Sequence, residues 1–200
     1  MKDSITLNYY NQNAQNFTQG TIDVNFEEIQ ERFLTLLTPG GKILDFGCGS
    51  GRDTKYFLGK GFIPEAVDGS EELCKIASQN TGIIVKHMLF SELDAIAAYD
   101  GIWACASILH LSKDQLKGVF FRMSRAIKEN GYIYTSFKYG TFEGYRKGRF
   151  FTDFTEESFK KFVQEVPDIK IADLWISEDV RQGRSDEKWL NLILQKSDTV

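Results

Sequence analysis

Apolar positions along the chain follow two patterns that alternate with each other. Short continuous apolar runs predict buried strands at residues 42–46, 62–68, 82–88, 99–107 and 132–139. Between these runs, apolar residues recur every three or four positions and predict helices over residues 26–37 and 52–61, and after residues 70, 112 and 155. Two more apolar runs, residues 170–177 and 189–196, predict a final pair of strands.

Polar residues at the expected helix ends support this assignment. Ser70 and Thr155 are predicted N-caps, since a side-chain oxygen at this position accepts a hydrogen bond from the first turn. Ser112 and Gln115 have the spacing of a capping box. The helix that Ser112 opens is predicted to end at Asn130-Gly131.

The alternation of strands and helices predicts an α/β fold with a Rossmann-like, doubly wound, seven-stranded sheet that carries helices on both faces. Most strands are expected to be parallel. Only eleven residues, EDVRQGRSDEK, separate the last two strands, which is too short for a crossover helix. One antiparallel strand is therefore expected near the C-terminus. Residues 1–200 are expected to form a single domain, with residues 1–24 as a polar N-terminal arm or lid.

Composition and charge exclude several kinds of protein. A net charge of −4 disfavours a nucleic-acid binder, which usually carries a basic field. Three widely spaced cysteines and two histidines fit neither a disulfide framework nor a metal centre, so no metal is expected. No segment has the length and composition of a signal peptide or a membrane span, so we expect a cytoplasmic protein with no membrane partner.

The segment ILDFGCGSG, residues 43–51, indicates a ligand site. In open α/β sheets, ligands bind beyond the carboxyl ends of the strands, where Gly47, Gly49 and Gly51 follow the first strand. Their spacing is G-x-G-x-G, whereas dinucleotide loops have G-x-G-x-x-G. Asp45 precedes them, and Asp68, at the end of the second strand, can accept both hydroxyls of a ribose. A cationic adenosine derivative fits these features better than a phosphate.

The run LDFGCGSGRDTKYFLGKGF, followed by AVDGS, resembles the class I S-adenosylmethionine-dependent methyltransferases. The resemblance extends over about residues 40–140, and the arm and tail are similar to a small-molecule, tellurite-resistance-type branch. It implies S-adenosylmethionine as cofactor and S-adenosylhomocysteine as product. It also implies a role for Gly47, Gly49 and Gly51 beneath the methionine part, for Asp45 near the ammonium group and for Asp68 at the ribose.

The resemblance implies further cofactor contacts around the same edge of the sheet. Gly69 and Ser70 are expected to follow the adenine edge, and Met88 and Leu89 to sandwich the ring. Related proteins commonly place an acid next, and in this chain Phe90, Ser91 or Glu92 occupies that place, with Phe90 among the expected cofactor contacts. The remaining expected contacts are Cys105 and Ala106 near the sulfonium and Tyr10 folded over the cofactor from the arm.

Candidate acceptor residues come from two segments. His110 lies just beyond the fourth strand, where it serves either as a general base or as a structural residue bonded to backbone. Residues 138–154 follow the fifth strand and mix basic and aromatic side chains. We interpret them as an acceptor-side loop in which Tyr139, Arg146 and Arg149 bind an anionic acceptor, although a solvated loop explains the pattern equally well.

The sequence therefore predicts a methyltransferase that acts on a small-molecule acceptor by in-line transfer, as a monomer or homodimer. The segment after the fourth strand lacks N-P-P-Y and D-P-P-Y, which are typical of methylation on amide-like nitrogens. Two alternatives stay open at this point. One is a nicotinamide- or flavin-dependent oxidoreductase on a similar sheet, and the other is a non-catalytic S-adenosylmethionine-binding protein.

Overall fold

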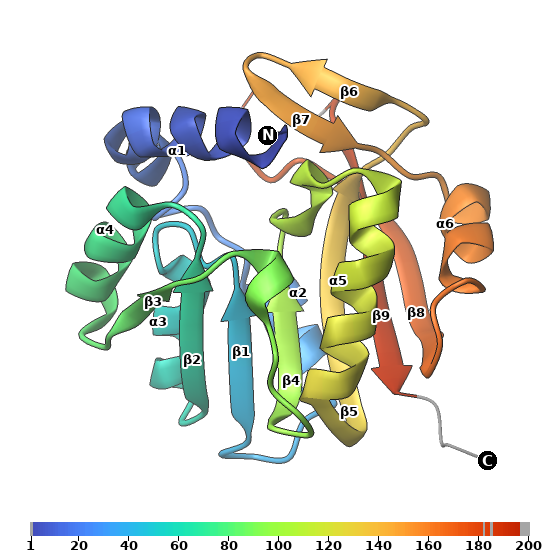
Figure 1. The fold of residues 1–200 in the computed structure, drawn as a ribbon. Helices are drawn as coiled ribbons and strands as arrows, with labels where there is room; N and C mark the ends of the chain where they lie inside the picture. Colours follow the sequence, from blue (N-terminus) through green and yellow to red (C-terminus); the bar gives the residue numbers. More distant parts are fainter. Residues whose placement is uncertain (1, 182, 185, 197–200) are drawn as a thin grey trace.

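A seven-stranded sheet forms the centre of the computed structural model, which describes residues 2–181, 183–184 and 186–196 (Figure 1). The strand order is β3-β2-β1-β4-β5-β9-β8. The strands are β1 (Lys42–Phe46), β2 (Ile63–Asp68), β3 (Val85–His87), β4 (Tyr99–Ala104), β5 (Ile127–Lys138), β8 (Ile169–Glu178) and β9 (Lys188–Lys196). Neighbouring strands pair in parallel except at β9, which is antiparallel to both β5 and β8. The predicted fold class is confirmed.

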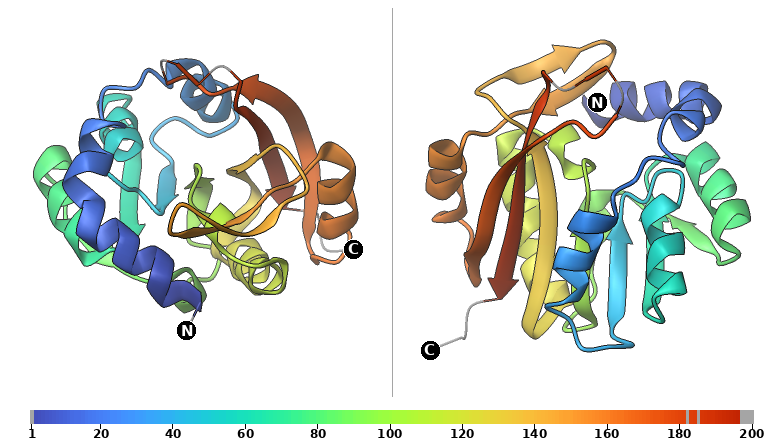
Figure 2. Two further views of the ribbon diagram at one scale, coloured as in Figure 1. Left: turned by 90° about the horizontal axis from the view of Figure 1, so that it is seen from above. Right: turned by 180° about the vertical axis from the view of Figure 1, so that it is seen from behind.

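Helices cover both faces of the sheet (Figures 1 and 2). They are α1 (Lys2–Gln19), α2 (Glu27–Leu34), α3 (Arg52–Gly59), α4 (Glu71–Thr81), α5 (Lys113–Ala126) and α6 (Glu156–Val163), with short 3-10 helices η1 (Phe90–Glu92) and η2 (Ile108–His110). The predicted caps at Ser70, Ser112 and Thr155 are confirmed, because each side chain accepts a backbone N–H from its first turn. Among the described residues, no helix is long and apolar enough to span a membrane.

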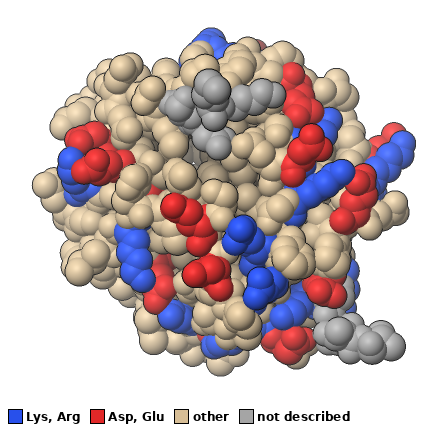
Figure 3. All heavy atoms as spheres, in the orientation of Figure 1, with Lys and Arg blue, Asp and Glu red and all other residues tan. Residues whose placement is uncertain are grey.

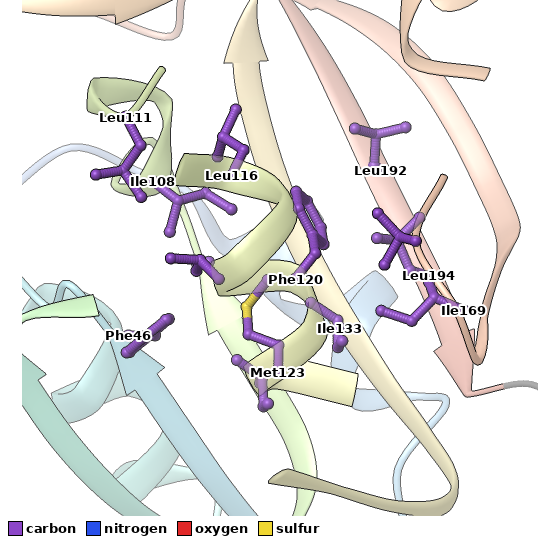
Figure 4. Packing of buried hydrophobic residues seen from close by; sticks show 14 of the residues in the cluster. Phe46, Ile108, Leu111, Leu116, Phe120, Met123, Ile133, Ile169, Leu192 and Leu194 are labelled. Carbon is purple, nitrogen blue, oxygen red and sulfur yellow. The ribbon is translucent and has the colours of Figure 1, made fainter. Parts of the chain in front are cut away.

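The central strands alternate between two hydrophobic cores because successive side chains point to opposite faces. Leu44 and Phe46 of β1 face the core under α5 and α6, whereas Ile43 faces the core under α2 and α3. In the first core, Phe120 and Met123 of α5 lie between the helix and the sheet (Figure 4).

Aromatic rings dominate the second core. Trp103 of β4 and Tyr134 of β5 stack with their ring centroids 4.1 Å apart. Phe33 of α2 and Phe57 of α3 pack against the Trp103 ring, with centroid distances of 5.2 and 5.4 Å. These four side chains are fully buried, so they fix both helices against the centre of the sheet.

One predicted helix boundary is wrong. The helix that begins after Ser112 ends at Ala126, and Ile127 already belongs to β5. The carbonyl groups of Arg125 and Ala126 accept hydrogen bonds from the backbone of residues 97 and 98, so the helix needs no glycine cap. Asn130 lies within β5, at an irregularity in its pairing with β4, and has a φ of +60°.

The predicted strand over residues 82–88 is shorter than expected, since β3 comprises only Val85–His87. It pairs with β2 from Ala66 onward. Pro64 therefore precedes the part of β2 that lies between two strands and has a partner strand, β1, on one side only, which suits a residue without a backbone N–H.

Two segments outside the sheet cover the carboxyl ends of its parallel strands (Figures 1 and 2). The predicted arm is helix α1, although residue 1 of the arm lies outside the described residues. The predicted loop over 138–154 contains an antiparallel ribbon of β6 (Glu143–Arg146) and β7 (Arg149–Thr152), which the sequence analysis missed. Lys147 and Gly148 connect the two strands with φ of +48° and +77°, the left-handed backbone of a two-residue hairpin turn.

Gly51 and Gly61 provide a matched test of why the loop after β1 needs glycine. Both have a φ of +81°, but a Cβ at Gly51 would lie 2.7 Å from Thr81 Cγ2 of α4, whereas a Cβ at Gly61 would meet no atom within 4 Å. We expect Gly61→Ala to lower the free energy of unfolding by about 1 kcal/mol and Gly51→Ala by about 2–4 kcal/mol, because only Gly51→Ala adds a clash to the backbone strain.

Urea unfolding of the ligand-free protein measures both values. Equal losses for the two variants would show that close packing between the loop and α4 does not explain the glycine.

Candidate functional site

A cavity of about 820 Å³ lies between the carboxyl ends of the parallel strands and the layer formed by α1 and the β6–β7 ribbon. This volume is typical of small-molecule sites. Among the predicted site residues, the cavity is lined by Tyr10, Gly47, Gly49, Asp68, Gly69, Leu89, Phe90, Cys105, Ala106, His110, Tyr139, Arg146 and Arg149. The structure thus brings together residues as far apart in the sequence as Tyr10 and Arg149, which are separated by 139 positions.

Asp68 presents a buried carboxylate at the end of β2. Its Oδ2 accepts a hydrogen bond from the Gly49 backbone N–H at 2.9 Å, and its Oδ1 accepts one from the Ser70 N–H at 2.8 Å. Burial raises the pKa of this carboxyl, while these two hydrogen bonds oppose the rise. Each carboxylate oxygen has a second lone pair, so Asp68 can also accept hydroxyl donors from a ligand.

Ser70, beside Asp68, does not line the cavity and has a structural role. Its hydroxyl caps α4 by accepting the Leu73 N–H, and it donates to Asn11 Oδ1 of α1 at 2.6 Å. Nearby, a Cβ at Gly69 would lie 2.8 Å from the Leu7 side chain of α1, and one at Gly49 would lie 3.0 Å from the Phe17 ring. These close approaches show that α1 packs directly on the glycine loop and the end of β2.

Two of the predicted site residues, Asp45 and Gly51, do not line the cavity. The Asp45 Oδ2 accepts a hydrogen bond from the Thr54 hydroxyl of α3 at 2.5 Å. Burial, together with the nearby charge of Asp53, raises the pKa of the Asp45 carboxyl. The charged pair that does line the cavity is Arg52 and Asp53, at the start of α3.

Arg52 and Asp53 form a two-point ion pair that the sequence analysis missed. The Arg52 Nε and Nη2 donate to Asp53 Oδ1 and Oδ2 at 2.8 and 2.9 Å. Trp103 Nε1 and Gln30 Nε2 also donate to this carboxylate, at 2.8 and 2.6 Å. A guanidinium beside a carboxylate matches the opposite charges of an amino-acid group. The adjacent letters R-D directly after the glycines were the available sequence signal.

The wall beyond β3 is apolar. Leu89 and Phe90 line the cavity, and the Phe90 ring packs edge-on against Phe46 with a centroid distance of 4.8 Å. Met88 packs against the hydrophobic core and does not line the cavity. Glu92 uses its Oε2 to accept the Leu89 N–H at 2.7 Å. This wall offers a flat ligand two apolar side chains and no carboxylate from residues 88–90.

Cys105 and Ala106 line the cavity after β4. Ala106 has a φ of +47°, and its N–H donates to Ser136 Oγ at 2.9 Å, which holds this strained turn against β5. Burial raises the pKa of the Cys105 thiol to about 12. The thiol is therefore protonated at neutral pH and is not an activated nucleophile.

Tyr10, His110 and Arg149 meet on the opposite side of the cavity, from α1, η2 and β7. His110 Nδ1 lies 2.7 Å from the Phe150 carbonyl oxygen, so this nitrogen carries the proton and donates it. The Tyr10 hydroxyl then donates to His110 Nε2 at 2.8 Å, and Arg149 Nη1 donates to the Tyr10 oxygen at 3.2 Å. Burial lowers the pKa of His110 from 6.5 to about 4, which makes the imidazole neutral at pH 7.

The other two predicted acceptor residues occupy more open positions on the cavity wall. Tyr139 is 37% exposed, and Arg146 forms an ion pair with Asp153. On the face shown in Figure 3, acidic and basic side chains are mixed, without a field of one sign. Within the part of the chain that the structure describes, no group of three or more His, Cys, Asp or Glu side chains is arranged to hold a metal ion.

Comparisons with known proteins agree with this architecture. Residues 43–131 match a family model described as a methyltransferase domain. Among curated protein sequences, none matches the chain. Solved structures with a similar fold include 1,6-didemethyltoxoflavin-N1-methyltransferase of Burkholderia thailandensis, crystallised with 1,6-didemethyltoxoflavin and S-adenosylhomocysteine (22% identity, 98% of this chain and 87% of that one, TM-score 0.75).

Two further structures show the range of proteins with this fold. One is a TehB-like SAM-dependent methyltransferase of Corynebacterium glutamicum (19% identity, 96% and 98% coverage, TM-score 0.68). The other is the [4+2]-cyclase SpnF (14% identity, 85% and 80% coverage, TM-score 0.66). The glycine loop, the acid at the end of β2 and the matched family model agree with each other: residues 43–131 are similar to a methyltransferase domain, and the chain shares the fold of solved SAM-dependent methyltransferases.

Proposed function

We propose that this protein transfers the methyl group of S-adenosylmethionine to a small-molecule acceptor and releases S-adenosylhomocysteine. The observation that carries the proposal is a single covered cavity with two chemically different ends. Asp68, the glycine loop and the Arg52–Asp53 pair line one end, and Tyr10, His110 and Arg149 line the other. The similar 1,6-didemethyltoxoflavin-N1-methyltransferase was crystallised with S-adenosylhomocysteine and 1,6-didemethyltoxoflavin, which supports the same assignment.

The residues at the first end fit each part of the cofactor. The Asp68 carboxylate has free lone pairs for the ribose hydroxyls, and the apolar Leu89 and Phe90 side chains suit the adenine ring. Arg52 and Asp53 carry the charges that complement the carboxylate and ammonium of the methionine part. When bound, the cofactor supplies a methyl group on a sulfonium sulfur, which is already activated for displacement.

The residues at the second end position the acceptor and exclude water. Helix α1 and the β6–β7 ribbon cover the cavity, and its volume of about 820 Å³ suits a small molecule beside the cofactor. We assign the Tyr10 hydroxyl and the neutral His110 to proton handling. If the acceptor arrives protonated, its proton passes to the Tyr10 oxygen while the Tyr10 proton passes to His110 Nε2.

Asp68→Ala tests the cofactor end. We expect this variant to bind S-adenosylmethionine and S-adenosylhomocysteine more weakly by about 1–3 kcal/mol, because the ribose hydroxyls lose their acceptor. Calorimetric titration measures the affinities, with NADH titrated in parallel and Asp94→Ala, an exposed carboxylate, as control. Tight binding of NADH and none of the adenosyl ligands would favour the oxidoreductase alternative, and unchanged affinity in Asp68→Ala would reject the ribose role.

The neutral state of His110 predicts how stability depends on pH. Because the pKa is about 4 in the folded protein and near 6.5 in the unfolded chain, the unfolded state binds more protons between these values. The contribution of the neutral imidazole is complete above pH 6.5 and is lost as the pH falls toward 4. We expect His110→Asn to reduce this loss relative to the wild type.

Urea unfolding of both proteins between pH 4 and 7 measures the difference in slope. Parallel curves would mean that His110 is not held neutral by its surroundings.

A further inference from the structure

We infer that the acceptor is an organic acid whose carboxylate binds Arg149. The inference rests on the proposed function, since it concerns the acceptor end of the same cavity. Arg149 lies in β7 and lines the cavity beside Tyr10 and His110.

The Arg149 guanidinium is incompletely bonded in the structure. Its Nη1 donates to the Tyr10 oxygen, whereas its Nε is buried and has no hydrogen-bond partner. A buried N–H that has lost water without gaining an acceptor costs about as much as a lost hydrogen bond. Within the described residues, Arg149 also has no carboxylate at ion-pair distance, so its positive charge lacks a counter-ion.

Four other arginines of the cavity wall have a carboxylate within ion-pair distance, and a fifth, Arg122, donates its Nη1 to the Leu93 carbonyl oxygen at 3.1 Å. Arg52 pairs with Asp53, Arg146 with Asp153 and Arg181 with Asp179. Arg184 is more exposed and lies 3.9 Å from Glu187. The chain therefore supplies an internal carboxylate to four of these arginines and a backbone carbonyl to the fifth, and leaves the buried Arg149 Nε without an acceptor, which a ligand can provide.

The groups around Arg149 specify what kind of anion fits. The rings of Tyr9, Tyr10 and Phe151 surround the guanidinium, with its carbon 4.7, 5.7 and 5.2 Å from their centroids. His110 is neutral and therefore provides no negative charge to pair with the Arg149 guanidinium. Aromatic walls favour a planar or apolar body, and a carboxylate matches the fork of donors that a guanidinium offers.

A comparison of benzoate with benzamide tests the inference, because the two probes have the same shape and differ in charge. Each is titrated into the protein saturated with S-adenosylhomocysteine. We expect benzoate to bind at least about tenfold more tightly than benzamide, since a charge-assisted hydrogen bond to a desolvated guanidinium is lost in the amide. In ¹⁵N-resolved spectra, benzoate is also expected to shift the Nε–H signal that Arg149→Lys removes.

Variants identify the group responsible. Arg149→Gln is expected to bring the two affinities within about twofold of each other, while Arg149→Lys retains part of the preference because it keeps the charge. Arg184→Gln removes the same charge from an exposed position of the cavity wall and is expected to retain the full preference. Thermal unfolding of each variant checks that it is folded.

Three results would overturn the inference: no binding of benzoate, equal binding of benzoate and benzamide, or a preference that survives Arg149→Gln. Titration of S-adenosylhomocysteine alone separates these results from a failure of the proposed function. If that ligand does not bind, the methyltransferase proposal fails. If it binds normally and benzoate shows no preference, only the assignment of an acidic acceptor fails.

Discussion

The carboxylate of Asp53 connects the sheet, two helices and the cavity. It is 7% exposed and accepts hydrogen bonds from Gln30 of α2, from Arg52 of α3 and from Trp103 of β4. A buried charge is stable only when it is paired and hydrogen-bonded. Loss of the carboxylate would leave these buried donors without an acceptor, and loss of the donors would leave a buried charge without partners. The same contacts place Arg52 on the cavity wall. The stability of the second core and the electrostatics of the site therefore share one side chain.

The cavity separates two kinds of chemistry along the edge of the sheet. Acidic groups gather around the glycine loop, where Asp68 lies on the wall and Asp45 lies beneath it. The opposite end holds a neutral imidazole, a phenol and a guanidinium. A cationic ligand and an acidic one can thus occupy the same cavity without competing for the same protein charges. This division of charge suits the proposed methyl transfer, in which the cofactor and the acceptor occupy opposite ends of the cavity.

Local patterns predicted the sheet, the caps at Ser70, Ser112 and Thr155, and the edge of the sheet at which the cavity lies, because these depend on spacing along the chain. The end of α5 was mispredicted since its last carbonyl groups are bonded by residues 97 and 98, far from the helix in sequence. The contact between Tyr10 and His110 spans 100 positions and requires α1 to cross the finished sheet. No local pattern contains that information. The ribbon at Lys147-Gly148 is different, because its turn residues were visible and were not recognised.

The position of α1 has a consequence for synthesis of the chain. This helix is synthesised before the other described elements, yet its partners described above begin at Gly49 and extend to Arg149. Most of the stability of a helix in a protein comes from tertiary packing, and the partners of α1 are complete only when the ribbon has been synthesised. During translation the sheet can form its two hydrophobic cores while the carboxyl ends of its parallel strands are still uncovered. The earliest of the described elements to be synthesised is thus among the last to reach its final position.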